Sequence, residues 1–128
     1  MKFWKFQYLG EESMEMCIRE KIFPMIQTNI PGLVTTDQEV LGRIRPGDGV
    51  LIAELLGEQA KIHAIGKTIM GIDSKLEAIW VRNINFRQPN ERGGLIHWQT
   101  KTAFEISPEP AKRYGLKELV EHYVKVGA

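Results

Sequence analysis

The sequence predicts an α+β fold in which about five strands form one small, curved sheet or barrel. Segments with strand-like alternation recur along the chain, whereas helical periodicity is confined to the region after the first strand and to the C-terminal end. Because helices do not follow the strands one by one, a doubly wound parallel sheet is not expected. The 128 residues, 43% apolar and 26% charged, correspond to a single globular domain over residues 1–128.

The first strand is expected over residues 2–9 and the first helix directly after it. Aromatic side chains fall on both faces of this strand, which indicates an interior position in the sheet, and Gly10 ends it. Apolar residues then recur at helical spacing up to Pro24, which stops the helix. Cys17 lies in this pattern, and as the single cysteine it excludes an intramolecular disulfide and a Cys-based zinc site, so we expect a buried structural thiol.

The middle and end of the chain supply the remaining elements. The capping box Thr36–Glu39 begins a second, short helix, and the turn Arg45–Gly49 breaks it. Asp48 is expected to stabilise that turn. Further strands are expected at 50–55, 61–70, 76–86 and 95–106, with a polar, basic loop at 87–94. Pro108 and Pro110 are expected to end the strand region, and an amphipathic C-terminal helix is expected at 116–124.

Three stretches in this order resemble the PUA-like superfamily, in particular its EVE and YTH-like branches. The first is the aromatic opening strand at 3–6. The second is the Pro-Gly-Asp turn within 44–52, followed by the Gly-containing strand at 62–67. The third is the Trp-Val strand within 79–84, before the basic loop. The resemblance covers residues 2–106 and leaves the C-terminal helix as an addition.

The resemblance implies a small β-barrel flanked by helices, with a concave pocket beside the opening strand. In EVE- and YTH-like relatives such pockets hold a base, often a modified one, between aromatic side chains. Other relatives hydrolyse modified nucleosides or serve in RNA modification or translation. The leading hypothesis is therefore a non-catalytic domain that holds a nucleobase, modified or not, in single-stranded or flipped form.

A base pocket needs flat apolar walls and a few polar groups for the base edge. The wall candidates are Trp4, Trp80 and Trp98, although a tryptophan on a strand of a small domain is more often part of the core. The edge candidates are Gln7 and Asn29, because an amide carries both a donor and an acceptor. A role for Asn29 in stabilising a turn is an equal alternative.

The net charge of +1 excludes a broad positively charged surface that would bind nucleic acid. Positive and negative charges are, however, unevenly distributed along the chain. Residues 79–102 carry a local balance of +3, and residues 31–60 carry −3. A basic loop at a pocket rim could contact one or two phosphates. The candidates for these contacts are Arg87, Arg92 and Lys101, and the alternative is an ordinary solvated loop.

No sequence pattern indicates catalysis. The chain lacks G-x-S-x-G and P-loop motifs, and its three histidines have no metal-ligand spacing. His63, in an apolar strand, is expected to be a hydrogen-bonded structural residue. The alternatives are an ASCH-like hydrolase acting on a modified nucleoside, for which Lys5, Thr102 and Glu105 are among the conceivable residues, and a small-ligand or protein-interaction module using 116–124.

The expected partner is nucleic acid, either DNA or RNA. We expect no cofactor, no metal and no membrane partner, and the oligomeric state is left open. The start of the chain has no signal-peptide pattern, and no apolar run approaches the length that crosses a membrane, which predicts a cytoplasmic location.

Overall fold

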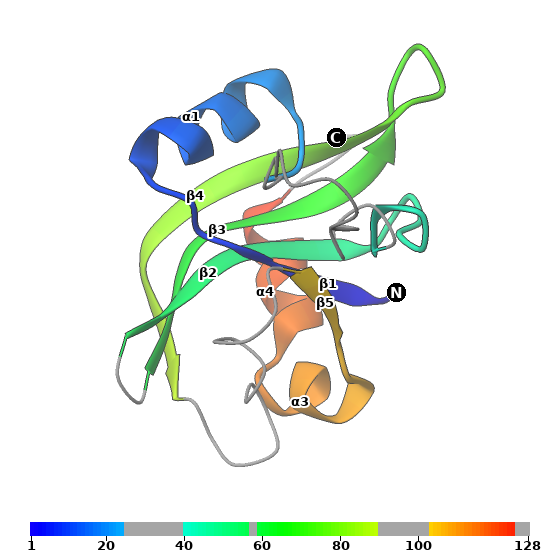
Figure 1. Cartoon of the computed structure of the whole chain (residues 1–128). Coiled ribbons are helices and arrows are strands. Elements are labelled where there is room, and N and C mark those ends of the chain that lie inside the picture. The colour runs from blue at the N-terminus through cyan, green and yellow to red at the C-terminus, as the bar shows by residue number, and fades with distance from the viewer. Residues whose placement is uncertain (25–39, 57–58, 90–102, 125–128) are drawn as a thin grey trace, which may run out of the picture.

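The computed structural model describes residues 1–24, 40–56, 59–89 and 103–124. They form a five-stranded mixed sheet and the helices that cover it (Figure 1). The strands are β1 (Phe3–Gln7), β2 (Gly49–Leu56), β3 (Gln59–Met70), β4 (Leu76–Pro89) and β5 (Ala103–Ile106), in the sheet order β4-β3-β2-β1-β5. This confirms the α+β class with five strands. Within the described residues the sheet is open, because β4 and β5 lie at opposite edges, so the predicted closure into a barrel is not observed there.

Strand β1 lies inside the sheet, as its two-sided aromatic pattern predicted. It pairs in parallel with β2, where Trp4 is aligned with Val50, and antiparallel with β5, where Trp4 is aligned with Glu105. The parallel pairing is possible because a long crossover containing the first helix separates the two strands in the sequence. The remaining pairs, β2 with β3 and β3 with β4, are antiparallel.

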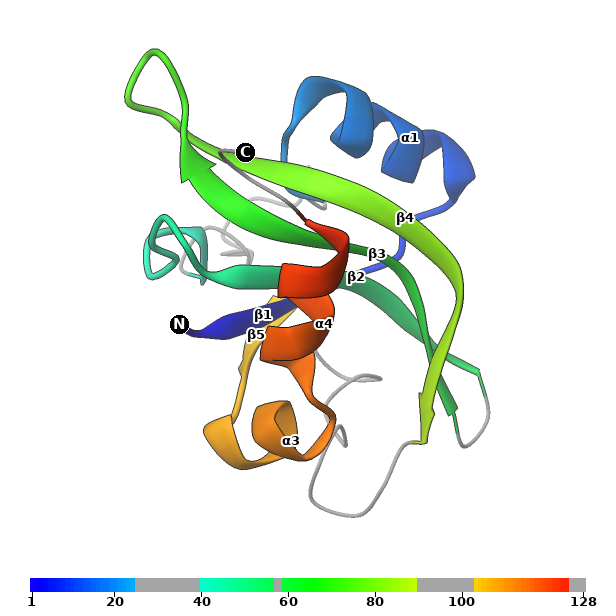
Figure 2. The same cartoon turned by 180° about the vertical axis from the view of Figure 1, so that it is seen from behind.

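Helix α1 (Glu11–Glu20) covers one face of the sheet, and helices α3 (Pro108–Arg113) and α4 (Leu116–Tyr123) cover the other (Figures 1 and 2). Each face has its own core. Trp4 and Phe6 pack with Met14 and Cys17 on the α1 face, whereas Phe3 packs with Val120 on the α4 face. Cys17 is buried, as the helical pattern predicted. No helix in the described part of the chain is long and apolar enough to cross a membrane.

Helix α3 was not expected, because Pro108 and Pro110 were interpreted as ending the strand region. Pro108 occupies the first turn of this helix, where backbone N–H groups have no acceptor within the helix, so its missing N–H costs no hydrogen bond. The prolines therefore begin a helix here and do not prevent one. Of the strand expected over 95–106, only β5 falls within the described residues. The capping box Thr36–Glu39 lies outside them, and the described helical residues begin at Val40.

The side chain of Asp48 fixes the junction of β1, β2 and the preceding turn. Its Oδ2 accepts hydrogen bonds from the indole Nε1 of Trp4 at 3.0 Å and from the backbone N–H of Arg45 at 3.0 Å. Its Oδ1 accepts the backbone N–H of Lys2 at 3.1 Å. The hydroxyl of Thr68 in β3 accepts the backbone N–H of Asp48 at 2.9 Å. The expected role of Asp48 in the turn is confirmed, and it extends to the core.

Replacing Asp48 with Ala is expected to lower the free energy of unfolding by about 3 kcal/mol, because the fully buried indole N–H of Trp4 would lose its acceptor. Urea denaturation measures the change. The matched control is Asp73→Ala in the exposed turn after β3, for which a change within about 0.5 kcal/mol is expected. Equal losses in the two variants would contradict the assignment.

Candidate functional site

The two described tryptophans lie in the core on the α1 face. Trp4 is fully buried, and its indole is held by Asp48, so it presents no surface to a ligand in this structure. Trp80 is 6% exposed, and its Nε1 donates to the backbone oxygen of Ile22 at 2.9 Å. This bond ties β4 to the chain just after α1 and fixes the indole plane.

Trp80 belongs to an aromatic cluster with Phe6 and Phe23. Its ring lies nearly perpendicular to both phenyl rings, with centroid separations of 6.5 Å to Phe6 and 6.3 Å to Phe23. The two phenyl rings are 5.4 Å apart. Phe23 lies at the outer side of this cluster and borders a cavity. Edge-to-face contacts of this kind hold a ring in a defined orientation.

The cavity beside Phe23 has a volume of about 680 Å³, within the range of ligand pockets in proteins. Helix α1, the segment that follows it, Leu41 and the start of β4 line it. Most of the described lining is apolar, with Ser13 and Lys75 as its polar groups. The described lining residues are Ser13, Met16, Cys17, Ile22, Phe23, Leu41, Lys75 and Leu76. Burial raises the pKa of the Cys17 thiol, which keeps it protonated and unreactive.

Gln7 lies on the opposite face of the sheet. Side chains alternate along β1, so Gln7 shares the α4 face with Phe3 and Lys5. Lys5 is fully buried, and its ammonium donates to the Gln7 side-chain oxygen at 2.7 Å and lies 5.7 Å from the centre of the Phe104 ring. The structure therefore does not bring Gln7 together with Trp80, and the two cannot contact the same base.

Four of the sequence-predicted site residues lie outside the described residues: Asn29, Arg92, Trp98 and Lys101. The expected start of the basic loop at Arg87 is wrong, because pairing with β3 continues β4 to Pro89. The backbone of Arg87 is aligned with Lys61 of β3, and its side chain is outside the described part. The predicted phosphate contacts of the basic loop and the predicted base contact of Trp98 therefore stay predictions.

A polar cluster that the sequence did not predict lies at the end of β1 on the α1 face. The rings of Tyr8 and His63 are stacked in parallel, 3.6 Å between centroids and 4° between planes. Nε2 of His63 is 2.9 Å from a carboxylate oxygen of Glu54, which confirms the hydrogen bond expected for this histidine. Arg82 pairs with Glu11 beside them.

A β-bulge explains why this cluster was missed. Ile62 and Ala64 both have partners in β2 and in β4, but His63 between them has none in either ladder. The irregularity turns the side chain of His63 toward Tyr8, which simple alternation along β3 does not foresee. The Nδ1 atom of His63 is buried and has no hydrogen-bond partner in the described structure.

The surroundings of Tyr8 raise its pKa above the ordinary value of 10.0. Burial is the largest cause, followed by the hydrogen bond to Glu11 and the negative charges of Glu11 and Glu54, whereas Arg82 acts in the opposite direction. The neutral phenol is therefore the form that the fold favours.

The raised pKa of Tyr8 means that its neutral phenol stabilises the folded state. This contribution is fully present below the pKa of tyrosine in the unfolded chain, and it is lost as the pH rises through the pKa of Tyr8 in the folded protein. We expect the free energy of unfolding to fall more steeply between about pH 9 and pH 11 in the wild type than in Tyr8→Phe. Urea denaturation at stepped pH measures this, with Tyr123→Phe on the exposed side of α4 as the control. A Tyr8→Phe profile parallel to the wild type would contradict it.

Among the described residues, no group of three or more His, Cys, Asp or Glu side chains could hold a metal ion. No protein-family model matches the chain, and no curated protein matches it.

Proposed function

We propose that this chain is a non-catalytic nucleic-acid-binding domain that holds one nucleobase in the cavity beside Phe23. The observation that carries the proposal is the juxtaposition of a cavity of about 680 Å³ with the fixed Phe6–Phe23–Trp80 cluster. The helical crossover after β1 and the Asp48 turn into β2 support a PUA-like fold as the framework of this proposal.

The lining of the cavity suits the faces of a base. A base stacked on an aromatic ring gains roughly 1–3 kcal/mol, and Phe23 supplies such a ring at the cavity wall. Trp80 packs edge-on behind Phe23 and is itself held by Ile22, so the wall is fixed before a ligand enters. Among the described lining residues, the hydroxyl of Ser13, which also hydrogen-bonds Cys17, can serve the base edge.

Charge at the mouth fits a short contact with the nucleic-acid backbone. Lys75 lines the cavity and can pair with a phosphate beside the bound base. Arg87, Arg92 and Lys101 are proposed to contact phosphates further along the strand. Arg87 lies near the other end of β4, roughly 36 Å along that strand from Leu76, so it does not contact the phosphate next to Lys75. With a net charge of only +1, binding of this kind depends mainly on the base and has a shallow salt dependence.

Binding is favoured over hydrolysis by the groups that line this cavity. Of its described lining residues, Ser13, Cys17 and Lys75 carry chemically reactive groups, and burial keeps the Cys17 thiol protonated. No carboxylate or imidazole that could act as a general base is among these described lining residues.

Fluorescence anisotropy with short labelled single strands, of DNA and of RNA and with and without modified bases, tests the proposal. Phe23→Leu keeps an apolar side chain in the core but removes the flat ring, and we expect it to weaken binding about tenfold. Lys75→Ala is expected to weaken the binding of every oligonucleotide by a similar factor. Lys112→Ala, on the opposite face of the sheet, is the matched control and should bind like the wild type.

Two further variants address Arg87 and the proposed contacts outside the described residues. Trp98→Ala and the pair Arg87→Ala with Arg92→Ala should each weaken binding if the basic loop lies at the same site. Absence of binding to every oligonucleotide, or unchanged affinity in Phe23→Leu, would overturn the proposal. Release of a free base or altered nucleoside in a mass-spectrometric screen would favour the hydrolase instead.

A further inference from the structure

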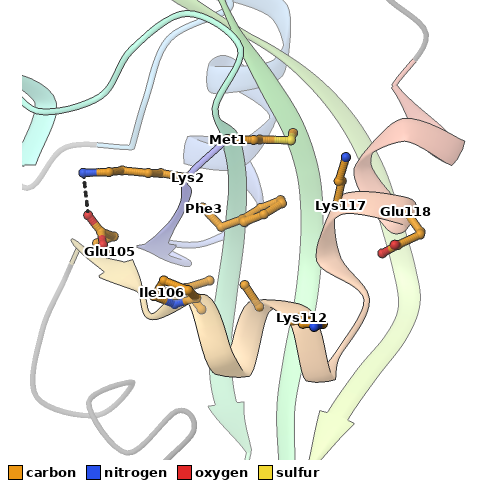
Figure 3. Close-up of a pocket in the computed structure, with 10 residues that line it drawn as sticks. Met1, Lys2, Phe3, Glu105, Ile106, Lys112, Lys117 and Glu118 are labelled. Carbon is orange, nitrogen blue, oxygen red and sulfur yellow. Dashed lines mark ion pairs between the residues drawn. The ribbon is translucent and has the colours of Figure 1, made fainter.

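A second cavity lies on the opposite face of the sheet, between β1, β5 and helices α3 and α4, with a volume of about 270 Å³. Its floor is apolar: the ring of Phe3 lies at its centre in Figure 3, and the other apolar residues among the described lining are Met1, Ile106, Pro108 and Ala111. The sheet separates this cavity from the one beside Phe23, so the two sites can be tested independently.

Charged side chains form the rim on two sides of Phe3. Lys2 and Glu105 stand on one side, and Lys117 and Glu118 on the other, with Lys112 at the turn of α3 (Figure 3). Among the described residues, the rim therefore carries three lysines and two glutamates.

The acidic groups do not balance the lysines locally. Glu105 is already paired with two cations, Lys2 at 3.3 Å and Arg43 at 3.6 Å. Within the described residues, Lys112 and Lys117 have no acidic partner, although both line the cavity. Two ammonium groups beside an apolar floor form a surface that is complementary to an anion with an apolar body.

We propose that this cavity binds a small amphipathic monocarboxylate, with its hydrocarbon part against Phe3 and Ile106 and its carboxylate between Lys112 and Lys117. The three lysines and two glutamates of the described rim leave one net positive charge. A ligand with a single negative charge matches this balance. The cavity lies at the small end of ligand pockets, which limits the apolar part to a short chain or one ring.

Titration of the full chain with butanoate, hexanoate and octanoate, followed by NMR of the Ile106 and Ala111 methyl groups, tests the proposal. Burial of each added methylene should lower Kd about fourfold until the cavity is full. Octylamine and octan-1-ol, which share the chain but not the carboxylate, should bind at least tenfold more weakly.

The combined variant Lys112→Gln and Lys117→Gln should weaken octanoate binding at least tenfold, whereas Lys75→Gln, at the other cavity, should leave it unchanged. Both lysines are exposed, so the fold should survive their replacement. Ala111→Leu provides a second variant, because the larger side chain fills the cavity and should abolish binding.

Several results would overturn the proposal. These are no methyl shifts at millimolar carboxylate, equal binding of octan-1-ol and octanoate, or unchanged affinity in the double lysine variant. Shifts confined to residues around Phe23 would place the ligand in the other cavity and equally reject this site. None of these results depends on whether the chain binds nucleic acid.

Discussion

The carboxylate of Asp48 is the interaction on which the rest of the structure depends. It lies at the point where the chain enters β2 and joins the start of β1, the indole of Trp4 and the preceding turn. Because Trp4 is fully buried, its N–H needs this acceptor inside the core. The glycines beside Asp48 serve the same junction. Gly47 has a φ of +95°, and a Cβ on Gly49 would lie 2.5 Å from the ring of Phe3.

With β1 fixed at the centre of the sheet, its alternating side chains are divided between two separate environments. Trp4, Phe6 and Tyr8 face α1, and Phe3, Lys5 and Gln7 face α4. A cavity lies on each face, one bordered by the aromatic cluster around Trp80 and the other by the ring of Phe3. The two cavities differ in chemistry because one has a single lysine and the other has a charged rim.

The main elements could be predicted from local pattern, whereas the site residues could be predicted only in part. Alternation and turn residues located the strands and the interior position of β1. The buried state of Cys17 and the hydrogen bond of His63 also followed from their positions in apolar segments. Helix α3 was missed because its prolines were interpreted as breakers, although a proline in the first turn is compatible with a helix. Gln7 was grouped with the tryptophans, but strand alternation places it on the other face.

By itself, the sequence determined the α+β class, the order of the strands and the position of β1 inside the sheet, because periodicity and turn chemistry act within a few residues of each other. The tertiary structure decided which side chains meet. The stacking of Tyr8 on His63 results from a bulge in β3, and the cavity at Phe23 forms where α1 and β4 come together. Such contacts join residues that are distant in the chain, and their geometry depends on register and packing rather than on local pattern.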